Sequence, residues 1–187
     1  MAKIDMKATV IATLDSDADD GVAFHLEDEE GTELESLVFD KGKFHGMKKS
    51  DVHVVRFKLV QEKGMTLEFA QGKDVALWVA QGTDQTIPDC PTSQPSQPNP
   101  IFYGDKSNGN TLTAINTNPC ECFFNFSLNF VDPKSTTPTK LIRYDPVGEN
   151  KNNGIDDRGS EFSTFALVIG IGAVAVLGFL VYQAFLD

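Results

Sequence analysis

An apolar run near the C-terminus constrains this chain more than any other feature. Residues 163–186 read STFALVIGIGAVAVLGFLVYQAFL, with no charged side chain and with Gln183 as the only strongly polar interruption. At ~1.5 Å rise per residue, a helix of this length covers roughly 35 Å, against about 30 Å for the hydrocarbon core of a bilayer. A buried helix of a soluble protein would normally carry a polar stripe, and this segment has none. The sequence therefore predicts one transmembrane helix over residues 163–186.

The position of this segment predicts a single-pass, tail-anchored topology. The N-terminal residues 1–7 contain no apolar run of signal-peptide length and no small-residue cleavage site. The simplest insertion then leaves the preceding domain on the cytoplasmic side of the membrane. Lys151 and Arg158 stand near the helix among acidic residues, so the charge distribution adds little to this orientation.

Small residues along the same segment suggest contacts between helices. Ala166 and Gly170 are spaced as a small-xxx-small pair, and Gly172 and Gly178 thin other faces of the helix. The surface can serve a homo-oligomer in the bilayer. The alternative is that these glycines have no role in helix contacts, because glycine is common in membrane helices.

The charge of the chain excludes one large class of partner. Its formal net charge is -11, and residues 15–40 contain many carboxylates without one Lys or Arg. Binding to a nucleic-acid backbone needs clustered cations, so we expect no nucleic-acid partner. The bilayer is the expected partner through insertion of the helix, and no protein partner can be named.

The residues before the anchor have the pattern of strands. Short apolar and β-branched runs alternate with polar residues and are separated by turn residues. Phe124, Phe126, Leu128 and Phe130 share one face of a strand, and the opposite face is polar enough to be solvated. We expect an all-β, antiparallel, Ig-like β-sandwich over residues 1–155, with strands at 7–14, 22–26, 34–39, 52–59, 65–69, 77–79, 112–115, 122–131 and 140–144.

Two segments read as connections. Residues 87–100, IPDCPTSQPSQPNP, are rich in proline and small polar residues and predict a crossover between sheets or a linker. The Gly- and Asn-rich residues 148–154 are expected to begin a tether, which residues 156–162 continue to the apolar helix.

Motifs for metal or cofactor binding are weak. The loop DSDADDG at residues 15–21 resembles a calcium loop, but its glycine comes one place late and Leu26 stands where a closing glutamate is needed. A hairpin turn is the better interpretation. A zinc site would take its ligands from the cysteines and histidines of the chain, but these residues lack the spacing of zinc ligands. They are Cys90, Cys120, Cys122, His25, His45 and His53. We expect no cofactor.

Several pieces between residues 50 and 155 resemble, in order, the DP-EP family of small bacterial β-sandwich proteins. They are DVHVVRFKLV, GMTLEFAQGKDVALWVAQG, DCP at residues 89–91, LTAINTN, FFNFSLNFVD and YDPVGEN. The resemblance implies cleavage of the chain after the aspartate of an Asp-Pro pair and linkage of that aspartate to a lysine. The matching residues here are Asp145 and Pro146.

This sequence departs from the family pattern in two respects. No Glu-Pro pair follows Asp145, and neither Lys134 nor Lys140 can be assigned as the partner for a cross-link. The alternative is that Asp145-Pro146, like Asp132-Pro133, only begins a turn.

Three functions follow from the sequence. The first is a tail-anchored protein that displays a β-sandwich for binding or assembly, without enzymatic activity. The second is a self-processing domain that cleaves its own Asp145-Pro146 bond. The third is an oligomeric structural membrane protein of an envelope or virion.

Overall fold

A computed structural model describes residues 1–44, 47–48, 50–81, 87–119, 121–137 and 140–151 of the chain. The chain divides into two compact units, Met1–Asn153 and Gly154–Asp187. Within the residues just given, no helix has both the length and the hydropathy of a membrane span. The predicted tether at 156–162 and the predicted helix at 163–186, with Ala166, Gly170, Gly172 and Gly178, lie outside the described residues.

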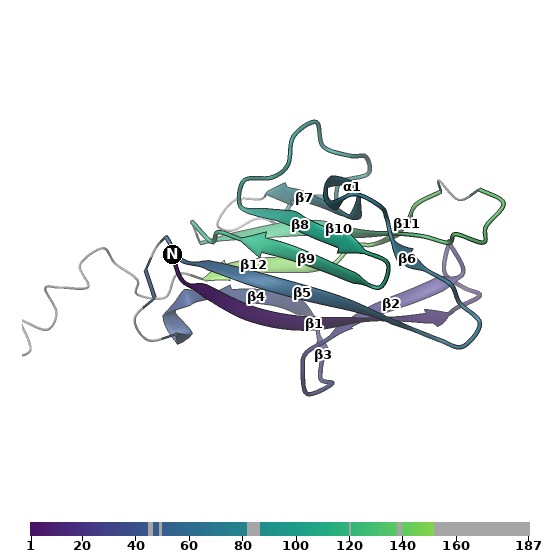
Figure 1. Ribbon diagram of the computed structural model, residues 1–187, viewed down its shortest axis with the longest axis horizontal. Coiled ribbons are helices and arrows are strands. Elements are labelled where there is room, and N and C mark those ends of the chain that lie inside the picture. Colours follow the sequence, from purple (N-terminus) through teal and green to yellow (C-terminus); the bar gives the residue numbers. More distant parts are fainter. Residues whose placement is uncertain (45–46, 49, 82–86, 120, 138–139, 152–187) are drawn as a thin grey trace, which may run out of the picture. The chain divides into compact units, whose positions relative to one another are not determined.

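The first unit is all-β and contains two sheets (Figure 1). Strand order in the first sheet is β3-β2-β1-β5-β9-β8, and in the second it is β11-β10-β12-β4, with β6 and β7 also paired to β10. The first sheet consists of β1 (Lys3–Leu14), β2 (Val22–Glu27), β3 (Glu33–Leu34), β5 (Val52–Gln61), β8 (Phe102–Asn108) and β9 (Thr111–Asn116). The second consists of β4 (Ser36–Asp40), β6 (Glu68–Phe69), β7 (Leu77–Gln81), β10 (Cys122–Val131), β11 (Ile142–Tyr144) and β12 (Val147–Lys151).

Two short helical turns complete the described part of the fold: the 3₁₀ turn η1 (Lys41–Lys43) and α1 (Lys73–Ala76). Residues 87–100 contain no strand and lie between β7 of the second sheet and β8 of the first. Their prolines suit this position because they cannot donate to a sheet ladder.

The hairpin of β1 and β2 confirms the turn predicted for DSDADDG. The backbone amide of Asp15 donates to the carbonyl of Gly21 at 3.0 Å, and the amide of Asp17 donates to the Asp15 carboxylate at 2.9 Å. Gly21 has φ +73°, a conformation that glycine adopts without steric cost. The aspartates therefore shape a tight turn, as short polar side chains commonly do.

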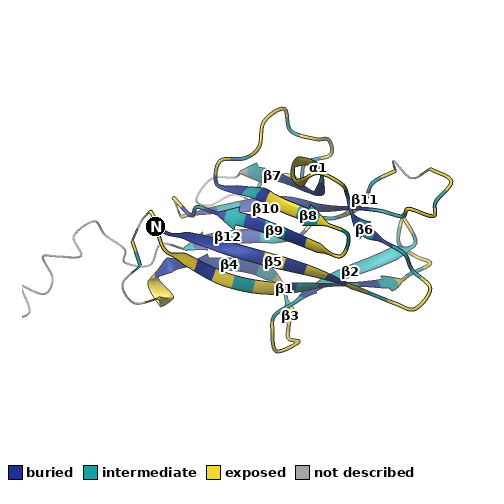
Figure 2. Ribbon diagram, in the orientation of Figure 1, coloured by how far each residue is buried: buried dark blue, intermediate teal, exposed yellow. Residues whose placement is uncertain are grey.

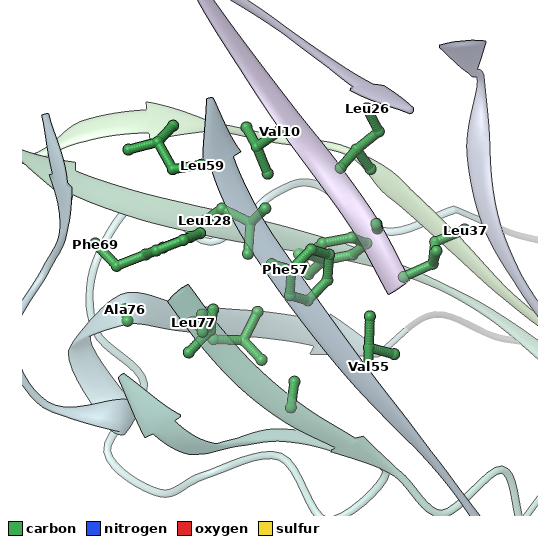
Figure 3. Close-up of a cluster of buried hydrophobic side chains, with 14 of the residues drawn as sticks. Val10, Leu26, Leu37, Val55, Phe57, Leu59, Phe69, Ala76, Leu77 and Leu128 are labelled. Atoms are coloured by element: carbon green, nitrogen blue, oxygen red, sulfur yellow. The ribbon is translucent and has the colours of Figure 1, made fainter. Parts of the chain in front are cut away.

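The core lies between the sheets and is mainly aliphatic and aromatic. Val10, Phe57 and Leu59 from the first sheet point toward Phe69 and Leu128 from the second (Figure 3). The predicted apolar face of β10 is confirmed, because Phe124, Phe126, Leu128 and Phe130 are all buried. Removal of this apolar surface from water is the main favourable term for the fold.

The prediction that the other face of β10 is solvated was wrong in its C-terminal half. Ser127 and Asn129 are fully buried. The Asn129 amide donates to the backbone carbonyl of Val75 in α1 at 2.7 Å, and Ser127 Oγ bonds to Asn129 Oδ1 at 2.8 Å. The short α1 turn therefore covers this face, and hydrogen bonds offset the cost of burying its polar side chains.

The sheets are mixed, whereas the sequence predicted antiparallel pairing throughout. β1 pairs parallel to β5, from Lys3–Val52 to Ala12–Gln61, and β4 pairs parallel to β12. The predicted strand 34–39 is divided between the sheets, because β3 pairs with β2 whereas β4 pairs with β12. After β3 the chain crosses to the second sheet, forms β4 and returns as β5. This route is the long connection that the parallel pair of β1 and β5 requires.

The predicted start of the tether at residue 148 was wrong. Residues 147–151 form β12, which is hydrogen-bonded to both β10 and β4, so they belong to the second sheet and not to a tether. In the segment 65–69, only Glu68–Phe69 is strand, and β8 was not predicted. β8 is an edge strand with an irregular register between Gly104 and Lys106, and its charged residues obscure the alternating pattern.

Gly148 offers a test of β12 as a core strand. A Cβ at this position would overlap the ring of Phe124. We expect Gly148→Ala to lower the free energy of unfolding by about 1–3 kcal/mol, the usual cost of overpacking a core. Urea denaturation followed by fluorescence of Trp78 measures this loss.

The matched control is Glu149→Ala, at the next position of the same strand. Its partly exposed ion pair with Lys151, at 3.1 Å, should contribute less than about 1 kcal/mol. Equal stability of the two variants would contradict the placement of Gly148 against Phe124.

Candidate functional site

Asp145 and Pro146 lie between β11 and β12, and the second sheet holds the chain on both sides of them. Asp145 is exposed and Pro146 is buried. The carbonyl of Pro146 accepts a hydrogen bond from the amide of Phe126 in β10 at 3.1 Å. The Asp-Pro bond is therefore part of a short connection that is fixed at both ends by pairing with β10.

Cys90 is the unexpected neighbour of Asp145. Burial, followed by a hydrogen bond to the Asp145 side chain and the charge of Asp145, raises the pKa of the Cys90 thiol to about 12. Nearby, the guanidinium of Arg143 donates to the carbonyl of Pro91 at 3.2 Å. The DCP segment at 89–91 and the YDP segment at 144–146, far apart in sequence, thus come together.

This arrangement defines the chemistry that is possible at Asp145. The thiol of Cys90 is held protonated, so it serves as a hydrogen-bond donor to the carboxylate and not as a nucleophile. Lys140 Nζ lies 2.8 Å from Asp20 Oδ1, which directs this lysine to the β1–β2 turn. The groups brought together can orient the Asp145 carboxylate near its own peptide bond.

Among the residues considered for zinc binding, those that the structure describes do not form a cluster. Within the described residues, no group of three or more potential metal-ligand side chains comes together. Cys122 accepts a hydrogen bond from Asn150 at 3.7 Å, and His25 lies 3.1 Å from Glu27. Cys120 and His45 lie outside the described residues.

A second polar site, which the sequence did not reveal, is buried where β4, β9 and β12 end. We call it the Lys41 cluster. Buried residues alternate with more exposed ones along these three strands (Figure 2). The cluster consists of five buried polar residues, Lys41, His53, Asn116, Asn118 and Asn150.

Lys41 is 1% exposed and contacts the turn that follows β9. Its ammonium donates to the backbone carbonyls of Thr117, at 2.8 Å, and Asn118, at 3.2 Å. Burial lowers the pKa of Lys41, and the charge of Asp51 partly opposes this effect. A buried charge is costly unless it is solvated by such partners.

Asn118 connects three strand ends through its side chain and backbone. Its Nδ2 donates to the carbonyls of Phe39 at 3.0 Å and Lys151 at 3.3 Å, and its amide donates to Asn116 Oδ1 at 2.6 Å. Asn116 Nδ2 in turn donates to Asn150 Oδ1 at 2.9 Å. Asn118 has φ +41°, in the left-handed region that asparagine tolerates better than most residues.

His53 lies beside this network without joining it. Its ring meets Phe39 edge-on, with 5.4 Å between centroids, and Phe44, with 6.3 Å. The structure shows no hydrogen-bond partner for either ring nitrogen among the residues it describes. Burial, followed by the charge of Lys41, lowers the pKa of His53 to about 4, and Asp40 opposes this shift.

Neither a protein-family model nor a curated protein sequence matches this chain. The two candidate sites therefore stand on their own geometry. A sequence signal for the Asp145 site existed in the DCP and YDP segments, but the asparagines of the Lys41 cluster are scattered over residues 116–150 and carry no motif.

The buried, neutral His53 predicts a specific acid sensitivity. In the unfolded chain the imidazole takes up a proton as pH falls below about 6.5, whereas in the folded chain it does so only near pH 4. Stability should therefore decrease from about pH 6.5 to pH 4, and His53 should account for about 3 kcal/mol of that loss. His53→Leu removes this part of the loss.

The measurement is the free energy of unfolding in urea, at pH 7 and at pH 4, for the wild type and His53→Leu. His25→Gln is the control, because its side chain is partly exposed. If His53→Leu loses as much stability on acidification as the wild type, His53 is not buried in its neutral form.

Proposed function

We propose that this chain is a single-pass membrane protein that displays an Ig-like β-sandwich as a binding or assembly module. The observation that carries the proposal is the uncharged apolar run 163–186, which follows a domain whose last described strand ends at Lys151. The two sheets already bury each other's apolar faces, so the run is not needed to fill that core. An apolar run of this length favours insertion into a bilayer.

The Ig-like character of the domain is part of the proposal. Two sheets pack face to face, and the chain passes between them more than once, which is common to sandwiches of this class. The parallel pairs β1–β5 and β4–β12 distinguish this arrangement from a purely antiparallel sandwich.

The surface available to a partner is acidic at the turns of the first sheet. Asp17 and Asp19 in the β1–β2 turn, and Glu29 and Glu30 in the β2–β3 turn, are exposed. Neither turn contains a Lys or Arg. A partner that meets these turns should therefore present basic groups, since charge complementarity steers association.

Insertion into the bilayer is tested by two charges placed in the middle of the run. Each arginine near the centre of a membrane helix costs about 2.5–3.5 kcal/mol on the insertion scale. The double variant Val174→Arg, Leu177→Arg should therefore move the protein out of the carbonate-resistant membrane fraction. The control, Val174→Leu with Leu177→Val, keeps the run apolar and should remain in it.

Cells that express the same variants also allow a test of the orientation of the sandwich. If the sandwich is on the cytoplasmic side, protease added to intact cells leaves it whole, and permeabilisation exposes it. A wild-type chain extracted by carbonate as readily as the arginine variant would contradict the membrane proposal.

A second function, self-processing of the DP-EP type, is supported by one observation. The DCP and YDP segments, separate pieces of the resemblance, lie together through Cys90 and Asp145. In this reaction the Asp145 carboxylate attacks its own carbonyl carbon, a cyclic anhydride forms, and the bond to the Pro146 nitrogen breaks as that nitrogen takes a proton. Water or a lysine amine then opens the anhydride.

Intact mass after prolonged incubation at neutral pH tests this second function. We expect fragments that end at Asp145 from the wild type and none from Asp145→Ala, which lacks the nucleophile. Asp132→Ala is the matched control, since Asp132-Pro133 is the other Asp-Pro bond in the chain, and it should be cut like the wild type. An uncut wild-type chain would leave Asp145-Pro146 as a turn.

A further inference from the structure

The peptide bond between Asn118 and Pro119 is unusual in this structure because a buried cation contacts its carbonyl oxygen. Lys41 Nζ donates to the Asn118 oxygen at 3.2 Å and to the preceding Thr117 oxygen at 2.8 Å. Lys41 is 1% exposed and Asn118 is fully buried. A charge in such a water-poor site acts more strongly on a carbonyl than it would in bulk water.

The identity of the next residue limits how Asn118 can react. An asparagine commonly loses ammonia when the following backbone nitrogen attacks its carboxamide carbon, but the nitrogen of Pro119 carries no hydrogen and cannot complete that reaction. The remaining intramolecular route is attack by Asn118 Nδ2 on the backbone carbonyl carbon of Asn118. This attack closes a five-membered ring, so its two atoms are always held near each other.

We propose that Asn118 cleaves its own peptide bond to Pro119, by attack of Nδ2 on its backbone carbonyl, and that Lys41 stabilises the oxyanion formed. Donors that point at the oxygen where charge develops are a large contribution to acyl-transfer catalysis. Lys41 contacts the backbone oxygen of Asn118, and this contact is the reason for assigning it that role.

The reaction balances without a cofactor. A bond forms between Nδ2 and the backbone carbonyl carbon, and the bond from that carbon to the Pro119 nitrogen breaks with its electron pair. The Lys41 ammonium protonates the departing nitrogen and regains a proton from Nδ2. One product ends in a C-terminal succinimide at residue 118, and the other begins with a free secondary amine at Pro119.

The surroundings favour this bond over others in the domain. Pro119 is exposed, whereas Asn118, which carries the electrophilic carbonyl, is buried in the cluster. Asn116 Oδ1 holds the backbone amide of Asn118 at 2.6 Å, and Phe39 and Lys151 fix the carboxamide. The burial that lowers the pKa of Lys41 also makes its ammonium a better proton donor.

Cleavage would divide the sandwich without dissolving it. The fragment before the cut contains every strand of the first sheet, and the fragment after it contains β10, β11 and β12. β10 remains hydrogen-bonded to β6 and β7 of the first fragment, and β12 to β4. The two fragments should therefore separate only under denaturing conditions.

The test is intact mass spectrometry under denaturing conditions, on the full chain in detergent after long incubation in its folded state. The wild type should yield two masses, Met1–Asn118 lower by one water than the free acid and Pro119–Asp187. Asn118→Gly should stay uncut, because it lacks the nucleophile but adopts φ +41° readily. Lys41→Met should be cut more slowly, by roughly 10²-fold, the usual effect of losing one oxyanion donor.

Two controls make the result decisive. The wild type kept in guanidinium should be cut much more slowly than the folded chain, since unfolding removes Lys41 from the carbonyl. Circular dichroism should show that Lys41→Met and Asn118→Gly are folded; if Lys41→Met is not, the folded-versus-denatured comparison decides.

Three outcomes would overturn the proposal. The first is a folded wild-type chain that stays at full mass. The second is an uncut chain in which peptide mapping finds Lys41 linked to residue 118 with loss of one ammonia, which would mean that Lys41 attacks the carboxamide instead. The third is equal cleavage in folded and denatured chains. Fragments ending at Asp145 belong to a different reaction and leave this comparison unaffected.

Discussion

Strand β10 is the element on which the rest of the sandwich depends. Its two edges pair with four strands, β6 and β7 on one side and β11 and β12 on the other. Its inward face supplies Phe124, Phe126 and Phe130 to the core, and Phe130 stacks on Phe24 of the first sheet with 5.0 Å between ring centroids. One strand therefore provides both the hydrogen-bonded frame of the second sheet and much of the contact with the first.

The end of the sandwich is held by polar groups instead of apolar ones. Lys41 and Asn118 join the ends of β4, β9 and β12, and each donates to backbone carbonyls at or next to those ends. Buried polar groups cost stability unless they are satisfied, so such a network fixes one arrangement of the three ends. It also brings a buried cation and a buried carboxamide next to the peptide bond between Asn118 and Pro119.

The fold class could be predicted from sequence because most strands show the two-residue period of one buried face, as in β5 and in Phe124–Phe130 of β10. Pairing could not be predicted in the same way. Residues 34–39 read as one strand, yet they pass from one sheet to the other, and nothing in their alternation marks that change. The polar residues of β8 and β12 concealed two strands, because an edge strand and a strand near a buried asparagine cluster need not be apolar.

The two candidate sites also differ in how far they could be predicted from the sequence. Asp145 was found because it belongs to a short motif, whereas Cys90 became its neighbour only through folding. The Lys41 cluster depends on contacts between residues more than 70 positions apart in sequence, such as Lys41 and Asn118.

Native-state hydrogen exchange, read by mass spectrometry, tests whether the sandwich extends through β12 to Lys151. The amides of residues 147–151 should be protected to a degree comparable with those of β10. Exchange of residues 147–151 at the rate of a free tether would contradict this extension.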